Sequence, residues 1–444
     1  MNSSMVKKTP IDYNIVSQKI KASGVADLGN ATIRELVRLV NEIENASGEK
    51  FIRMEMGVPG LDPTSIGIEA EMKALKSGVA SKYPMIDGIP ELKNECSRFL
   101  KLFANIEVSP ECCIPTVGSM QGGFAAFMLL SKCRKERNTT LFLDPGFPVQ
   151  KQQHRALGIP YDSFDIYDYR GKKLHDKLES YLAKGNISSI IYSNPNNPSW
   201  ICFTEEELKI IGELATKYKV VVIEDLAYFA MDFRTDLSKP GEPPYQPSVA
   251  NYTDYYIMLV SSSKAFSYAG QRIGMLVISN KLFGSVYPDL FPYFRSEKFG
   301  YAMLYRAIYS LSSGTAHSVQ YAFAAMLKAA NDGKFNFVEH VREYGKRAQI
   351  MKKLFVNNGF QIVYDNDGEK SLADGFYFTF AYPGMKGNEL LTEMLYYGIC
   401  SISLEITGSK RLEGLRACTS QIKMDQMSLL EERLKRFHAD HTVI

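Results

Sequence analysis

The stretch TEEELKIIGELATKYKVVVIED at residues 204–225 joins a helical pattern directly to the pattern of a buried strand. Apolar residues recur at helical spacing from Thr204 to Tyr218, and an unbroken apolar run then ends in Glu224 and Asp225. A short run of β-branched residues after a helix is typical of a strand buried in a parallel sheet. The stretch therefore predicts one helix–strand step of an α/β fold.

The same alternation extends in both directions, from about residue 112 to residue 280. Five further apolar runs fit the strand pattern: CCIPTV (112–117), TTLFLD (139–144), SSIIYSN (188–194), YIMLVSSS (256–263) and IGMLVIS (273–279). Alternating strands and helices predict a doubly wound α/β sheet, in which ligands bind at the carboxyl ends of the strands. After Ser318 the pattern changes to longer helices and short strands, which predicts a smaller α+β domain. We expect residues 1–65 to be an N-terminal segment of the small domain, 66–318 the large domain and 319–444 the rest of the small domain.

Composition and charge narrow the classes of function. The 444 residues are 23% charged and 45% hydrophobic, which is typical of a globular protein and excludes a disordered or collagen-like chain. Lys and Arg number 52 against 49 Asp and Glu, so we expect no general affinity for nucleic acid or anionic membranes. The seven cysteines include no C-x-x-C pair and the six histidines are dispersed. We therefore expect reduced thiols and no metal site.

The beginning of the chain, MNSSMVKKTPIDYN, lacks the apolar stretch that a signal peptide needs. No run of about 18 apolar residues predicts a membrane span. The sequence thus predicts a cytoplasmic protein.

The segment LVSSSKAFSYAGQRIG (259–274) is the most informative for chemistry. Ser261, Ser263 and Arg272 offer N–H and O–H donors suited to a phosphate dianion. Lys264, which lies among them, could condense with an aldehyde. A solvated lysine after a strand is the simpler interpretation, because lysines are seldom buried.

A second site signal is the pair of acids that ends the strand KVVVIED. A desolvated carboxylate at Asp225 needs a partner, and a pyridinium nitrogen would serve, with Tyr228 three residues further on. The alternative is an aspartate that caps a helix.

Two more segments follow strands. In IIYSNPNNPSW (190–200) the prolines would fix the amides in place for a hydrogen bond to a ring substituent, or they would only make a turn. In IPTVGSMQGGFAAFMLL (114–130) the N–H groups of Gly118, Ser119 and Met120 open a helix and could cradle a phosphate. Small residues between a strand and a helix can also be there only for packing.

These four segments, in this order, resemble the fold-type I, class I/II aminotransferases that use pyridoxal 5′-phosphate (PLP). The resemblance implies a seven-stranded, mostly parallel sheet in the large domain and a Schiff base between PLP and Lys264. It also implies roles for residues around the cofactor: Gly118, Ser119, Met120, Ser261, Ser263 and Arg272 at the phosphate, Asp225 at the pyridine nitrogen, and Asn197 and Tyr228 at the ring oxygen.

The resemblance extends to segments outside the cofactor motifs. In KYPMIDGIPELK it implies that Tyr83 reaches the phosphate of a neighbouring subunit, hence a homodimer with shared active sites. In DPGFPVQ it places Phe147 on the cofactor ring, and in MGVPGLDP and LEGLRACTS it places Gly57 and Arg416 at the substrate carboxylate, with Asn197 also near the substrate. A guanidinium suits a carboxylate because it can donate two parallel hydrogen bonds.

Two features concern the substrate rather than the cofactor. Ser199 and Trp200, the only tryptophan, stand where the family usually has Thr-Gly, and a bulky ring there could reshape the pocket. Arg295 and Lys298 lie where relatives specific for dicarboxylates carry a second arginine, although a solvated surface pair is the favoured interpretation.

The resemblance implies transfer of an amino group from an amino acid to a 2-oxo acid, with Lys264 as the catalytic residue. A PLP-dependent carbon–sulfur β-lyase could use the same residues, because the bond that breaks is set by pocket walls. A non-enzymatic PLP-binding regulator is a more distant alternative. The sequence leaves the amino donor and acceptor open.

Overall fold

The computed structural model of the protein describes residues 9–442. It divides into two compact units, of which the first contains Met1–Gly60, Pro198–Trp200 and Glu343–Ile444 and the second contains Leu61–Asn197 and Ile201–Arg342. Residues 1–8, part of the stretch inspected for a signal peptide, lie outside the described residues. Between residues 9 and 442, no helix has the length and apolar character needed to cross a membrane.

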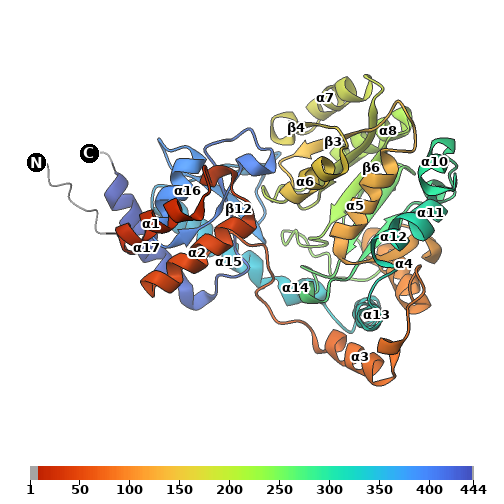
Figure 1. The fold of residues 1–444 in the computed structure, drawn as a ribbon, viewed down its shortest axis with the longest axis horizontal. Helices are drawn as coiled ribbons and strands as arrows, with labels where there is room; N and C mark the ends of the chain where they lie inside the picture. The colour runs from red at the N-terminus through yellow and green to blue at the C-terminus, as the bar shows by residue number, and fades with distance from the viewer. Residues whose placement is uncertain (1–8, 443–444) are drawn as a thin grey trace, which may run out of the picture. The chain divides into compact units, whose positions relative to one another are not determined.

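The second unit is built on a seven-stranded sheet with the order β2-β8-β7-β6-β5-β3-β4 (Figure 1). Only β8 runs antiparallel to its neighbours, and the other pairs are parallel. This sheet confirms the predicted mostly parallel α/β fold. Its strands are β2 (Cys113–Thr116), β3 (Thr139–Asp144), β4 (Tyr161–Asp165), β5 (Ile187–Ser193), β6 (Val221–Leu226), β7 (Tyr256–Ser261) and β8 (Gly274–Ile278).

Helices precede, connect and follow these strands. The longer ones are α3 (Ser65–Lys76), α4 (Pro90–Ala104), α5 (Gly118–Leu130), α6 (Pro148–Leu157), α7 (Lys173–Leu182), α8 (Glu205–Tyr218) and α13 (His317–Asn331). The shorter ones are α9 (Asn280–Phe283), α10 (Phe291–Phe294), α11 (Phe299–Ala302), α12 (Tyr309–Ser312) and α14 (Phe337–Val341). Helix α13, which the predicted division places in the C-terminal domain, packs against α3 and α4.

The stretch that begins the sequence argument folds as α8 followed by β6. A capping box starts the helix: the Thr204 hydroxyl accepts a hydrogen bond from the Glu207 backbone N–H at 3.2 Å, and the Glu207 carboxylate accepts one from the Thr204 N–H at 2.9 Å. Lys219, with φ 52°, ends the helix in a left-handed turn. All six residues of β6 are buried, so the apolar run carries the chain straight into the core of the sheet.

Apolar packing of α5 on the sheet forms the core of the second unit. Phe127 and Leu130 of this helix share a buried cluster with Leu259 of β7 and Leu276 of β8. Figure 1 shows α5 lying along the sheet. The packing therefore fixes the start of α5 relative to the ends of β7 and β8.

The first unit has an α+β architecture. A four-stranded antiparallel sheet has the order β14-β15-β12-β9, and β1 pairs with β13 in parallel. Helices around these strands share a buried apolar cluster with them. The elements are α1 (Tyr13–Ser23), α2 (Ile33–Ser47), β1 (Ile52–Arg53), α15 (Glu343–Asn357), β9 (Gln361–Ile362), β10 (Asn366–Asp367), β11 (Lys370–Ser371), β12 (Tyr377–Ala381), α16 (Gly387–Tyr396), β13 (Ile399–Cys400), β14 (Ile402–Ser403), β15 (Leu415–Cys418) and α17 (Met427–His441).

Candidate active site

Strand register brings most of the predicted site residues of the second unit to one edge of its sheet. Gly274, the first residue of β8, pairs with Thr116 at the end of β2 and with Ser261 at the end of β7. Ser193 at the end of β5 pairs with Asp225 near the end of β6. The antiparallel direction of β8 is the reason that Arg272, which precedes this strand, lies at the same edge as residues that follow the parallel strands.

At the start of α5, the guanidinium of Arg272 lies close to the backbone of Gly118. A Cβ atom on Gly118 would lie 2.5 Å from Nη2 of Arg272, and the φ of Gly118 is +67°, so this position requires glycine twice over. A Cβ atom on Gly274 would lie 3.1 Å from the backbone nitrogen of Ser119. The guanidinium of Arg272 is thus next to the N–H groups that open the helix, an arrangement suited to an anion.

Hydrogen bonds fix the groups around the start of α5. The Ser261 hydroxyl accepts a hydrogen bond from the Ser263 N–H at 3.1 Å, and Nη1 of Arg272 donates to the Ala269 carbonyl at 2.9 Å. Both serines are buried, whereas Arg272 is exposed. The arginine therefore keeps donors available to a ligand that enters from solvent.

Asp225 is a buried carboxylate with two N–H donors. Its Oδ2 accepts from the Gln150 side chain at 3.0 Å and its Oδ1 from the Ala227 backbone at 3.2 Å. Burial raises the pKa of Asp225 from 3.8 to about 6, and the donors from Ala227 and Gln150 and the charge of Lys264 limit that rise. Asp225 is therefore mainly ionised at neutral pH although it is only 7% exposed.

Gln150 is a site residue that the sequence analysis missed. It lies in the first turn of α6, three residues after Phe147, and Gln153 of the same helix donates to the Met120 carbonyl at 3.2 Å. Nothing in PVQKQQHRAL distinguishes one polar residue from the next. Only the position of α6 above β6 identifies Gln150 as the partner of Asp225.

Glu224, the neighbouring acid, is fully buried and bonded to a different set of groups. It accepts hydrogen bonds from the Tyr192 hydroxyl at 3.0 Å, from the Ser248 hydroxyl, and from the Val249 N–H at 3.4 Å. Burial raises its pKa to about 7 against these donors. Successive residues of a strand point to opposite faces, so only one of the two acids can share a face with the cradle.

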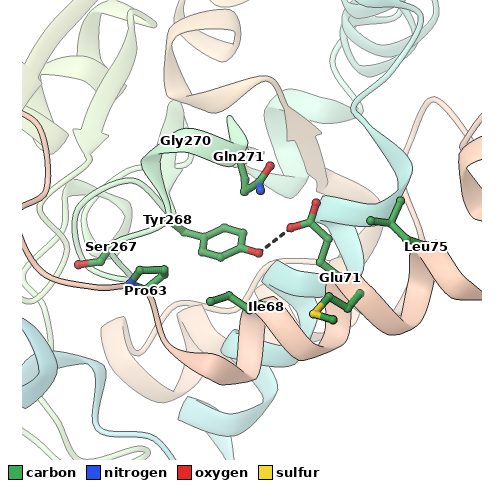
Figure 2. Close-up of a pocket in the computed structure, with 9 residues that line it drawn as sticks. Pro63, Ile68, Glu71, Leu75, Ser267, Tyr268, Gly270 and Gln271 are labelled. Atoms are coloured by element: carbon green, nitrogen blue, oxygen red, sulfur yellow. Dashed lines mark hydrogen bonds between the residues drawn. The ribbon is translucent and has the colours of Figure 1, made fainter.

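Lys264 lies just beyond β7 and is partly exposed. The loop that carries it is held from the other side by Tyr268, whose hydroxyl donates to Glu71 of α3 at 2.6 Å. Figure 2 shows this contact and the pocket of about 510 Å³ beside it. That pocket is lined by α3 and by residues 267–271 and contains none of the predicted site residues.

The other predicted residues of the second unit differ in exposure. Asn197 and Tyr228 are buried, and the Asn197 N–H donates to the Ser193 hydroxyl at 3.0 Å. Phe147 is partly buried at the start of α6, whereas Met120 and Tyr83 are exposed, Tyr83 by 91%. Two further cations belong to the exposed surface: Arg295 and Lys298.

In the first unit, Arg416 is buried on β15 with 1% exposure. Its Nη2 donates to the Glu55 carbonyl at 2.6 Å, and its guanidinium lies over the Tyr377 ring, 4.5 Å from the centroid. Gly57 packs against Tyr377: a Cβ atom at residue 57 would lie 1.9 Å from the tyrosine oxygen. The structure thus brings Arg416 and Gly57, both predicted from sequence, to the same tyrosine, which the sequence analysis did not identify.

Trp200 is fully buried in the same unit, with φ +64°. Its ring meets the Tyr377 ring edge to face, with centroids 6.1 Å apart.

Among residues 9–442, no cluster of three His, Cys, Asp or Glu side chains is suited to a metal ion.

Known proteins resemble this chain in sequence and in fold. The family described as aminotransferase class I and II matches residues 49–374. The chain is 27% identical over 243 residues to a probable aspartate aminotransferase of Methanocaldococcus jannaschii, which covers 55% of this chain and 61% of the relative. It is 27% identical over 245 residues to the LL-diaminopimelate aminotransferase of Natranaerobius thermophilus, which covers 54% and 60%. The aligned part thus spans about three-fifths of each curated relative.

Solved structures extend the likeness in fold to nearly the whole chain. The alanine aminotransferase of Pyrococcus furiosus superposes with a TM-score of 0.74 at 18% identity, covering 92% of this chain and 97% of that one. The names of these relatives do not favour the β-lyase or the regulator.

Proposed function

Because the chain belongs to the class I and II aminotransferase family, we propose that it is a PLP-dependent aminotransferase that moves an amino group from an amino acid to a 2-oxo acid. The observation that carries the proposal is the shared edge of the sheet. There, Lys264 follows β7, the buried Asp225 lies near the end of β6, and the guanidinium of Arg272 lies close to Gly118 at the start of α5.

The residues at this edge fit each functional group of PLP. The aldehyde would be held by Lys264, the pyridine nitrogen by Asp225, and the phosphate by the N–H groups at the start of α5 together with Arg272. We assign the remaining contacts as the family resemblance implies them: Ser119, Met120, Ser261 and Ser263 at the phosphate, Phe147 on the ring face, and Asn197 and Tyr228 at the ring oxygen.

When bound, PLP supplies an electron sink for the pair that remains when a bond at the substrate Cα breaks. Asp225 is ionised above about pH 6 and would hold a proton on the ring nitrogen. Its two N–H donors, from Gln150 and Ala227, orient the carboxylate without neutralising it.

Lys264 would act as the general base that takes the proton from the substrate Cα. Arg416 would bind the α-carboxylate of the substrate through paired N–H groups, and the family resemblance implies that Gly57 and Asn197 also contact the substrate. Each of these residues thus binds a group of the substrate, orients a group, or holds or moves a proton. An assay with a panel of amino acids and 2-oxo acids identifies the amino donor and acceptor.

We further propose a homodimer, because the exposed ring of Tyr83 is available to the phosphate site of a second subunit. A cytoplasmic location is supported by the seven cysteines, which are all free thiols, since thiols persist in reducing compartments.

Substitution of Lys264 tests the proposal. We expect Lys264→Ala to lose at least about a thousandfold in transamination, because one residue holds the cofactor and moves the proton. The variant should also lose the visible absorption of lysine-bound PLP. Turnover and absorption are both measured with a panel of amino acids. Lys209→Ala, at an exposed lysine of α8, is the matched control and should behave as wild type. Near-normal turnover in Lys264→Ala, or no PLP absorption in the wild type, would refute the proposal.

A further inference from the structure

Two aromatic rings in the first unit support the guanidinium of Arg416. We define the aromatic layer as Trp200 and Tyr377, both of which are buried. The Tyr377 ring lies against one face of the guanidinium, 4.5 Å from ring centroid to Cζ, and the Glu55 carbonyl accepts from Nη2 at 2.6 Å. A buried cation is costly unless nearby groups compensate it, and an aromatic face is attractive to a cation.

Strand pairing places Tyr377 under Arg416. Strand β12 pairs with β15 so that Thr379 stands directly opposite Arg416, and Tyr377 lies two residues before Thr379 on the same face. Tyr377 and Arg416 are therefore diagonal neighbours, which long side chains can span. The backbone register fixes the ring under the guanidinium.

Trp200 supports Tyr377 from the side. Its ring meets the tyrosine ring at an angle of 68°, an edge-to-face arrangement that aromatic pairs favour. The indole is fully buried, so it packs as part of the interior and holds the tyrosine ring in one orientation.

Two glycines provide the space that these rings occupy. A Cβ atom at Gly375 would lie 2.1 Å from Cε2 of Trp200, and one at Gly57 would lie 1.9 Å from the Tyr377 oxygen. Neither glycine has a left-handed φ, so the side chains and not the backbone conformation require glycine there. The absence of a side chain at Gly57 and at Gly375 thus leaves the space that the two rings occupy.

We propose that Trp200 and Tyr377 are positioning residues that orient Arg416 for the carboxylate of a small amino acid or 2-oxo acid. The inference rests on the proposed function, since it takes Arg416 as the carboxylate ligand. It adds that affinity depends on the aromatic layer beneath the arginine as well as on the arginine itself.

The single tryptophan supplies the assay. Trp200 emission is recorded in the PLP-loaded protein during titration with 2-oxoglutarate or pyruvate, neither of which has an amino group to transfer to PLP. We expect a saturable change in emission in the wild type. Tyr377→Leu should bind about tenfold more weakly, which corresponds to about 1.4 kcal/mol for a cation over an aromatic face. Tyr377→Phe keeps the ring and should stay within about threefold of wild type.

Steady-state kinetics provide a second readout. The loss in Tyr377→Leu should appear mainly as a raised KM for the 2-oxo acid, with kcat changed less, because the carboxylate is bound before and during the chemical step. A purely structural role would lower the amount of folded protein and leave the KM of the folded fraction unchanged.

Gly57 and Tyr377 also form a test pair that needs no large-to-small substitution. Gly57→Ala should weaken binding because its methyl group meets the tyrosine oxygen. Adding Tyr377→Phe removes that oxygen and leaves Cζ at 3.1 Å, so the double variant should recover most of the affinity. These two variants test the positioning role of Tyr377 if Tyr377→Leu does not fold.

The outcomes separate the two proposals. Wild-type affinity in Arg416→Lys would refute Arg416 as the carboxylate ligand and with it this part of the proposed function. A large loss in Arg416→Lys together with wild-type affinity in Tyr377→Leu, or no recovery in the double variant, would overturn the positioning role alone.

Discussion

Asp225→Asn should make the cofactor-free protein more stable at neutral pH, and it should abolish transamination by the PLP-loaded protein. The carboxylate is buried, and its pKa rises from 3.8 to about 6 on folding. A difference of about two pH units corresponds to about 3 kcal/mol at 1.36 kcal/mol per unit. An amide of the same shape carries no charge, but it has one oxygen in place of two. It can keep the bond from Ala227, and it keeps one with Gln150 only if the Gln150 amide turns to accept, so we take this loss as about 1 kcal/mol. We therefore expect a net gain of about 2 kcal/mol.

The pH dependence gives the sharper test. The folded protein binds the Asp225 proton more tightly than the unfolded chain does, so ionisation of this group lowers stability as the pH rises from about 4 to about 6. Above about pH 6 its effect is constant. The advantage of Asp225→Asn should therefore appear over this window and persist to pH 8.

Urea denaturation of the cofactor-free protein between pH 4 and 8 measures this difference. Asp176→Asn, at a side chain that is 96% exposed, is the control and should show no such window. An advantage that is the same at every pH, or a variant that is less stable at pH 8, would refute the burial argument.

Two further substitutions test the cradle and the partner of Asp225. Gly118→Ala should weaken PLP binding at least about tenfold in an absorbance titration, because its methyl group would lie 2.5 Å from Nη2 of Arg272. Gly158→Ala is the control: this glycine has a similar φ of +63° but open space around it, so the variant has the backbone strain without the clash. Gln150→Leu should raise the pKa of Asp225 above about 6, since a hydrogen bond to a charged group is worth about 1.5–3 kcal/mol. In a series of urea denaturations, the pH range over which ionisation of Asp225 lowers stability should then extend to higher pH. An unchanged pH range would contradict the role of Gln150.

Residues at strand ends were the predictable part of the site. Asp225 and Lys264 each follow an apolar run, and the ends of parallel strands meet at one edge of a sheet, so local pattern and general topology suffice to place them together. Most of the sheet was predictable for the same reason, because β2, β3, β5, β6, β7 and β8 are apolar runs. Strand β4 was not predicted, because it is short, polar and only partly buried.

Residues that act through long-range packing were not predictable. Tyr377 stands among the alternating aromatic residues of GFYFTFAY, and only the register of β12 with β15 determines which ring meets Arg416. Trp200 was noticed as a departure from the family, but its contact at Gly375 joins positions far apart in sequence. Patterns within one segment carry no information about such pairs.

The antiparallel direction of β8 makes residues 256–278 a hairpin that contains both Lys264 and Arg272. Closing a short loop costs little conformational entropy, so the pairing of β7 with β8 brings the lysine and the arginine to one end of the same local unit. A substitution that disrupts this hairpin should therefore displace both groups together.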